Sequence, residues 1–137
     1  MPVLHVSHDD ADRYTAMIRG HQLAIDQPVS DGGDDAGPAP VELFITSLAS
    51  CVAFYAGRWL RRHGYPEDPL GVTAYWTLGG RPARVDQIRL VLTIPDEVGP
   101  ERRAALLAVA THCTVHNTLV TPPDITVDFA EVGESAA

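Results

Sequence analysis

The segment from Val41 to His63 places the strongest constraint on the fold, because its apolar residues lie on nearly every side of a helix. Pro40 at the first helical position, arginines in the last turns, and Gly64 and Pro66 beyond them predict both ends of this helix. We expect it to be buried on most sides, which requires cover from several directions. A chain of 137 residues has limited material for that cover, so we expect a homodimer.

Short strands are predicted before this helix. Residues 2–8 and 13–27 have the apolar alternation of strands, and Arg19-Gly20 interrupts the second run at the tip of a hairpin. Residues 28–40 are rich in proline, glycine and aspartate, which cannot sustain a helix or a strand ladder. We interpret this stretch as a surface connector.

The second half of the chain predicts a second hairpin and further helices. Strict alternation of apolar side chains in residues 70–78 and 88–94 is typical of two paired strands. A helix should begin at Pro100 and carry Cys113 at helical spacing on its apolar face, followed by a break and a short helix. Residues 125–129 predict a last strand.

These elements together indicate an α+β fold. The expected order is three strands, the long helix, two strands, two helices and one strand. No repeat or internal linker divides the sequence, and its length suits one domain. We therefore expect residues 1–132 to form a single domain and residues 133–137 to form a flexible tail.

Composition excludes several classes of partner. The formal charge of −8 and the isoelectric point near 5.0 argue against electrostatic binding to nucleic acid or to an anionic membrane. The first residues resemble no signal peptide, and no uninterrupted apolar run reaches the length of about eighteen residues expected of a membrane span. These features predict a cytoplasmic protein in a reducing environment.

Two cysteines, Cys51 and Cys113, are the main candidates for covalent chemistry, because the chain contains no lysine. Thiols in a reducing compartment are more often free, metal-bound or redox-active than a permanent disulfide. Inert packing is the alternative, since cysteine is commonly buried. A nucleophilic Cys51 would need a nearby cation, because a thiol with a pKa of about 8.5 is mostly protonated at neutral pH. Arg19 is our candidate for that cation.

A zinc site is a further possibility. His112 and His116 are four residues apart with Cys113 between them, and Cys51 would complete a mixed sulfur and nitrogen set. No neighbouring glutamate gives a metalloprotease pattern, and the aspartates of residues 28–40 lack the spacing of a calcium loop. We expect no metal and no cofactor.

Three stretches of the sequence resemble the OsmC/Ohr-like proteins, the osmotically induced and organic-hydroperoxide-resistance group. Residues 37–51 are similar to the start of the central helix of this family, and residues 112–119 are similar to its second cysteine segment. Residues 18–26 resemble the hairpin that carries its arginine. The resemblance covers almost the whole chain in matching order. It implies an OsmC-like fold and an intertwined homodimer with active sites at the subunit interface.

The resemblance also implies a thiol peroxidase that reduces organic hydroperoxides to alcohols. In that reaction Cys51 would attack the peroxide, Cys113 would resolve the sulfenic acid as a disulfide, and Arg19 would activate the thiolate and orient the peroxide. An external dithiol would then reduce the disulfide. The alternative is a non-catalytic member of the same family that binds a hydrophobic ligand or senses redox state.

Glu42 is a candidate for the acidic partner of the arginine, with a departure from the family pattern. The peroxidase branch carries its glutamate ten positions before the first cysteine, where this chain has Val41. The offset of one residue turns a side chain by about 100° around a helix. A carboxylate that stabilises the helix N-terminus is the other interpretation of Glu42.

Four residues about one helical turn from Cys51 are candidates for an apolar substrate pocket. Such a pocket would favour bulky alkyl or fatty-acid peroxides over hydrogen peroxide. The four residues are Ser47, Leu48, Phe54 and Tyr55.

Overall fold

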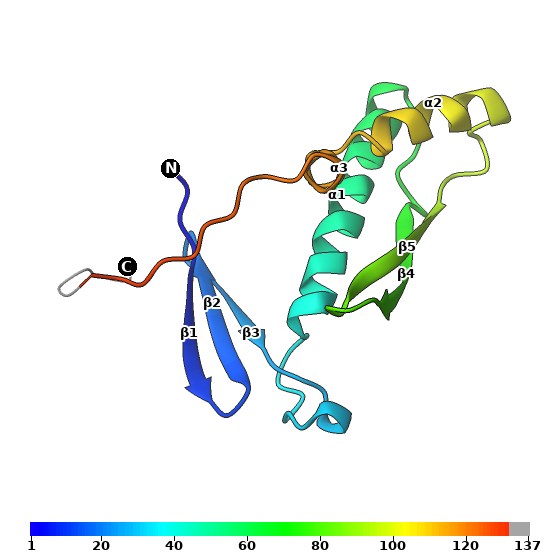
Figure 1. The fold of residues 1–137 in the computed structure, drawn as a ribbon. Helices are drawn as coiled ribbons and strands as arrows, with labels where there is room; N and C mark the ends of the chain where they lie inside the picture. The colour runs from blue at the N-terminus through cyan, green and yellow to red at the C-terminus, as the bar shows by residue number, and fades with distance from the viewer. Residues whose placement is uncertain (132–137) are drawn as a thin grey trace. The chain divides into compact units, whose positions relative to one another are not determined.

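The computed structural model describes residues 1–131, and its elements are labelled in Figure 1. The chain divides into two compact units, each described by itself. The smaller unit contains residues 1–43 and the described residues from Asp124 onward, and the larger unit spans Phe44–Pro123. The predicted tail at residues 133–137 lies outside the described residues.

The smaller unit contains a three-stranded antiparallel sheet. Its strands are β1 (His5–Asp10), β2 (Arg13–Ile18) and β3 (His21–Ile25), paired in the order β1-β2-β3. Arg19 and Gly20 join β2 to β3 with φ angles of 48° and 80°. Two residues with positive φ are the signature of the type I′ turn, whose twist matches that of paired strands. The predicted hairpin with Arg19 at its tip is confirmed.

The connector after β3 is organised by Asp26, whose structural role no sequence pattern predicts. The side chain is buried, and its carboxylate accepts hydrogen bonds from the backbone N–H groups of Gln27, Asp34 and Ala36. The bond from Ala36 is the main cause that lowers the pKa of Asp26, while burial opposes it. The connector contains the short 3-10 helix η1 (Val29–Asp31). After η1 the chain returns to Asp26 at the end of β3, where Asp34 and Ala36 bind its carboxylate.

Two glycines make this return possible. A Cβ atom on Gly33 would lie 2.1 Å from the carbonyl oxygen of Gln27, and one on Gly37 would lie 2.2 Å from that of Ala24. Both distances are far inside van der Waals contact with backbone atoms that cannot swing away. Any side chain at either position would push the connector off the end of β3.

The larger unit is built around helix α1 (Pro40–Arg62), of which Phe44–Arg62 belong to it. Figure 1 shows the hairpin of β4 (Gly71–Gly79) and β5 (Arg84–Thr93) beside α1, with α2 (Pro100–Ala110) and α3 (Thr114–Val120) nearby. The core consists of buried α1 residues together with buried residues near α2 and α3, and apolar side chains of the hairpin pack against it. Its members are Leu48, Val52, Ala56, Trp59, Leu60, Val98, Leu106, Ala110 and Cys113.

Helix α1 has the predicted bounds to within a residue and is partly buried within the described chain. Seven of its 23 residues are buried, and they form one stripe. Apolar residues elsewhere on the helix remain open, and Phe54 is 56% exposed. By length and composition alone α1 is able to cross a membrane, but the core helices of proteins outside membranes meet the same criterion. One chain alone therefore buries a single stripe of α1, and cover of its other faces by a second chain stays a prediction.

Two predictions need correction. Helix α2 ends at Ala110, so Cys113 lies outside it, in an extended conformation directly before α3. Residues 125–129 form no strand, and Ile125, Val127 and Phe129 are 81%, 92% and 99% exposed. The alternation of their side chains is typical of a strand, but a strand also requires a neighbour for its backbone, and this segment has none in the described chain.

Candidate thiol site

The two cysteines of the larger unit lie together. Cys51 is in the middle of α1 and is partly buried, whereas Cys113 is completely buried. Both are free thiols, and the side chain of Cys51 interacts directly with that of Cys113. The site therefore combines one partly exposed cysteine with one completely buried cysteine.

Local sequence explains the position of Cys113. Its extended backbone makes it the N-cap of α3, and its sulfur accepts a hydrogen bond from the backbone N–H of His116 at 3.4 Å. The next residue, Thr114, shares a hydrogen bond of 3.2 Å between its hydroxyl and that of Tyr55 on α1. Tyr55 is one helical turn from Cys51, so this bond fixes the start of α3 against the same stretch of α1.

The two sulfur atoms have unequal surroundings. Burial raises the pKa of the Cys113 thiol, and the N–H of His116 opposes that shift. The neighbouring Cys51 raises the pKa of Cys113 further, first through a hydrogen bond between the two side chains and then because two adjacent thiolates repel each other. Cys113 therefore stays protonated when a nearby sulfur carries charge. Such a pair suits a sequence in which Cys51 reacts first and Cys113 second.

The other two predicted site residues, Arg19 and Glu42, belong to the smaller unit. Arg19 is exposed at the tip of the β2–β3 turn. The Oε1 atom of Glu42 accepts a hydrogen bond from the backbone N–H of Ala39 at 2.8 Å, as the third residue of a capping box does. This hydrogen bond supports the interpretation of Glu42 as a stabiliser of the helix N-terminus. The catalytic roles of both residues stay predictions.

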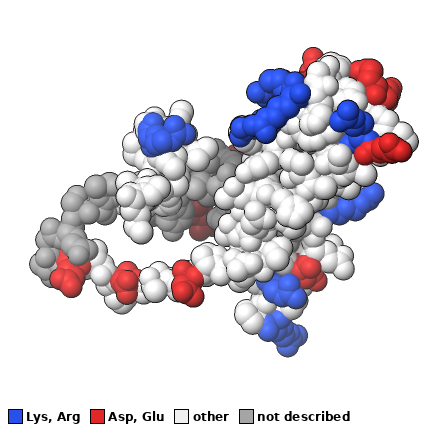
Figure 2. Space-filling view, turned by 90° about the horizontal axis from the view of Figure 1, so that it is seen from above, with Lys and Arg blue, Asp and Glu red and all other residues white. Residues whose placement is uncertain are grey.

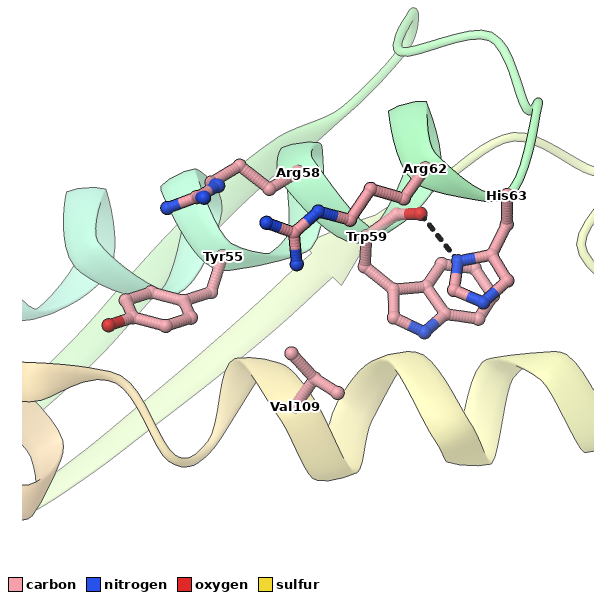
Figure 3. Close-up of a pocket in the computed structure, with 6 residues that line it drawn as sticks. All are labelled: Tyr55, Arg58, Trp59, Arg62, His63 and Val109. Atoms are coloured by element: carbon pink, nitrogen blue, oxygen red, sulfur yellow. Dashed lines mark hydrogen bonds between the residues drawn. The ribbon is translucent and has the colours of Figure 1, made fainter.

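Two of the four predicted pocket residues, Leu48 and Tyr55, line different cavities. Leu48 lines a groove of about 450 Å³ that is also bounded by β5 and by His116 and Leu119 of α3. Tyr55 lines a separate pocket of about 360 Å³ (Figure 3). Ser47 and Phe54 line neither of these two.

The described residues offer no ligand set for zinc. Among residues 1–131, no three His, Cys, Asp or Glu side chains are grouped so as to hold a metal ion. His112, one of the candidate ligands, uses Nδ1 to donate a hydrogen bond to the carbonyl oxygen of Ala108 at 2.6 Å. This contact gives His112 a structural role at the end of α2.

Comparison with known proteins establishes the family. The family model described as OsmC-like protein matches residues 32–128, a range that contains both cysteines. The chain belongs to the OsmC-like family. No curated protein matches this OsmC-like chain in sequence.

Solved structures share the OsmC-like fold. A candidate osmotic-stress-induced and detoxification response protein from Psychrobacter arcticus matches with a TM-score of 0.78 and 22% identity, covering 86% of this chain and 88% of that one. An OsmC-like protein from Mycoplasma pneumoniae matches with a TM-score of 0.76 and 17% identity, covering 89% of each chain. An organic hydroperoxide resistance protein from Legionella pneumophila, also described as a predicted redox protein, matches with a TM-score of 0.67 and 17% identity, covering 87% and 88%. At these identities the likeness concerns the fold.

Proposed function

We propose that this OsmC-like protein is a cytoplasmic dithiol peroxidase that reduces organic hydroperoxides to alcohols. The observation that carries the proposal is the direct contact of a partly exposed thiol, Cys51, with a buried thiol, Cys113, whose pKa is raised. The name of the Legionella relative, an organic hydroperoxide resistance protein, agrees with this chemistry.

The first step consumes the peroxide. The Cys51 thiolate attacks the terminal oxygen of the hydroperoxide, the O–O bond breaks, and the alkoxide leaves as the alcohol after it takes up a proton. Sulfur is oxidised by two electrons and becomes a sulfenic acid. The peroxide is reduced by the same two electrons.

The second step protects the oxidised sulfur. Cys113 attacks the sulfenic sulfur of Cys51, a disulfide forms, and the hydroxyl group leaves as water with the proton of the Cys113 thiol. The contact between the side chains makes this step faster than further oxidation to the irreversible sulfinic acid. An external dithiol then restores both thiols by disulfide exchange, so the cycle requires no cofactor.

The roles of Arg19 and Glu42 are part of the proposal. A guanidinium about 4 Å from the Cys51 sulfur would favour the thiolate by several kcal/mol at an effective dielectric constant near 20. Glu42 would orient this guanidinium in addition to capping α1. We further propose that the chain is an intertwined homodimer whose active sites lie at the subunit interface.

The groove lined by Leu48 is our candidate for the alkyl group of the peroxide. It is bounded by the apolar β5 residues Ile88 and Leu90 and by His116, whose backbone N–H contacts the sulfur of Cys113. The alkyl group of an organic hydroperoxide would be removed from water in this groove, which favours its binding. Hydrogen peroxide has no alkyl group and would gain nothing from the groove.

Mass spectrometry of the reduced protein tests the proposal. One equivalent of cumene hydroperoxide should lower the mass by about 2 Da, as a disulfide requires, and should yield cumyl alcohol. Cys51→Ser should consume no peroxide. Cys113→Ala should consume one equivalent and then hold a sulfenic acid that a dimedone probe traps. Unchanged thiols after minutes with the peroxide would instead favour a non-catalytic member of the family.

A further inference from the structure

We propose that the pocket between α1 and α2 binds a small aromatic carboxylate. It has a volume of about 360 Å³ and is lined by Tyr55, Arg58, Trp59, Arg62, His63 and Val109 (Figure 3). Small-molecule sites have volumes of roughly 300–1,000 Å³, so one compact molecule fits. All six residues belong to the larger unit, which makes the pocket complete within it.

The walls of the pocket are flat and held in place. Trp59 is 6% exposed, and the ring of His63 is stacked on it at 4.1 Å between centroids. The Nδ1 atom of His63 donates a hydrogen bond to the carbonyl oxygen of Trp59 at 2.8 Å, and Tyr65 also stacks on the indole at 5.8 Å. Val109 of α2 borders the pocket opposite α1 (Figure 3). Rigid aromatic and aliphatic walls favour a planar hydrocarbon body.

Two of the residues that line the pocket are arginines without a carboxylate partner among residues 1–131. Arg58 and Arg62 form no ion pair within residues 1–131, although the chain has 18 acidic residues, some of which are visible in Figure 2. Their neighbour Arg61 differs, because its Nε atom is 2.8 Å from a carboxylate oxygen of Glu67. The only described contact of the Arg58 guanidinium is with the ring of Phe54, at 5.3 Å from its centroid.

The positions of these donors indicate where an anion would lie. Figure 3 shows the guanidinium of Arg62 folded back along α1 above the space between Tyr55 and Trp59, with the guanidinium of Arg58 above Tyr55. The indole nitrogen of Trp59 is on the side of the ring that faces α2, and its N–H has no acceptor among residues 1–131. Two guanidinium groups and one indole N–H therefore remain available to a ligand.

A carboxylate matches these donors. Its two oxygen atoms accept paired hydrogen bonds from a planar guanidinium, and the bonds are stronger than those to a neutral acceptor. The largely apolar walls disfavour a multiply charged phosphate, which would have to leave water for hydrocarbon surroundings. The combination of a flat apolar body and a single negative charge selects an aromatic carboxylate.

Titration with 2-naphthoate, followed by ¹⁵N NMR of the indole N–H groups, tests the proposal directly. The chain has two tryptophans, and a Trp76→Phe variant assigns the two signals. The Trp59 signal should shift and saturate, while the Trp76 signal stays in place. The neutral analogue 2-naphthalenemethanol should bind about tenfold more weakly, because it lacks the charge. Neither compound is a peroxide, so failure of this proposal is distinguishable from failure of the proposed peroxidase.

Matched variants identify the donors. Arg58→Gln and Arg62→Gln should each weaken binding of 2-naphthoate about fivefold, and high salt should weaken it as well. Arg61→Gln, in the same turn of α1 but directed to Glu67, should leave the affinity unchanged. Val109→Phe, at a position 42% exposed, should fill the pocket and abolish the shift without disturbing the core.

Three results would overturn the proposal. One is a Trp59 signal that does not move up to about 10 mM 2-naphthoate, which corresponds to less than about 3 kcal/mol of binding free energy. Another is equal affinity for the acid and the alcohol. The third is a loss of affinity in Arg61→Gln as large as in Arg62→Gln.

Discussion

The two thiols differ in exposure although their side chains are in contact, and this difference is measurable residue by residue. Cys113 is 0% exposed, and its pKa is raised by burial, whereas Cys51 is partly open. Iodoacetamide reacts with thiolates that it can reach. At pH 8 it should therefore modify Cys51 at least about tenfold faster than Cys113, as judged by mass spectrometry of peptides. The unfolded protein is the control, in which both rates should agree. Equal rates in the folded protein would contradict the assigned order of reaction.

A second prediction concerns how the stability that Asp26 contributes depends on pH. Its pKa is lowered in the folded protein, first by the hydrogen bond from Ala36, so the ionised carboxylate stabilises the fold. This contribution is complete above the unfolded pKa, near 3.8, and disappears as the pH falls through the lower folded value. Asp26→Asn should therefore have a lower Tm than wild type at pH 7, and the difference should shrink below pH of about 3. A difference in Tm that is independent of pH would show that charge at Asp26 does not matter.

Sequence predicts single residues well only where their role is local. Arg19-Gly20 separates two alternating runs, which predicts a hairpin tip, and the structure has a turn there. Asp26 looked like any aspartate at the end of a strand, since its three donors come from a connector without a regular pattern. The contact between Cys51 and Cys113 depends on how α3 packs on α1, and no spacing in the sequence encodes that.

At the scale of the element, the N-terminus of α1 yields a prediction about Glu42. Glu42→Ala removes the acceptor for the N–H of Ala39, so the free energy of unfolding should fall by about 1 kcal/mol in urea denaturation. Glu42→Gln, which keeps an oxygen in the same place, should lose less. If both variants have wild-type stability but react slowly with peroxide, Glu42 acts on the chemistry rather than on the helix.

Helices and strands differ in how far the local sequence determines them. The ends of α1 follow from Pro40 and Gly64, which act on their own backbone. The β4–β5 hairpin was predictable because its partners are adjacent in the chain. Residues 125–129 have the alternation of a strand, but a strand forms only when it pairs with a neighbouring strand. The sequence around these residues does not identify that neighbour.

At the scale of the whole molecule, the proposed homodimer predicts the mass of the protein in solution. Phe54 on α1 and the side chains of Ile125, Val127 and Phe129 are all more than half exposed. Surface of this kind is normally covered in a stable protein. Sedimentation equilibrium at micromolar concentration should therefore give twice the chain mass of 14.8 kDa. A mass of one chain under those conditions would remove the dimer from the proposal.

The turn at Arg19 has one more consequence. A φ of 48° is unfavourable for an arginine by about 1 kcal/mol, and asparagine or glycine would adopt it with less strain. An Arg19→Asn variant should therefore be harder to melt than the natural chain. The natural residue therefore costs the turn some stability but holds a permanent positive charge at the hairpin tip, which the role proposed for Arg19 requires.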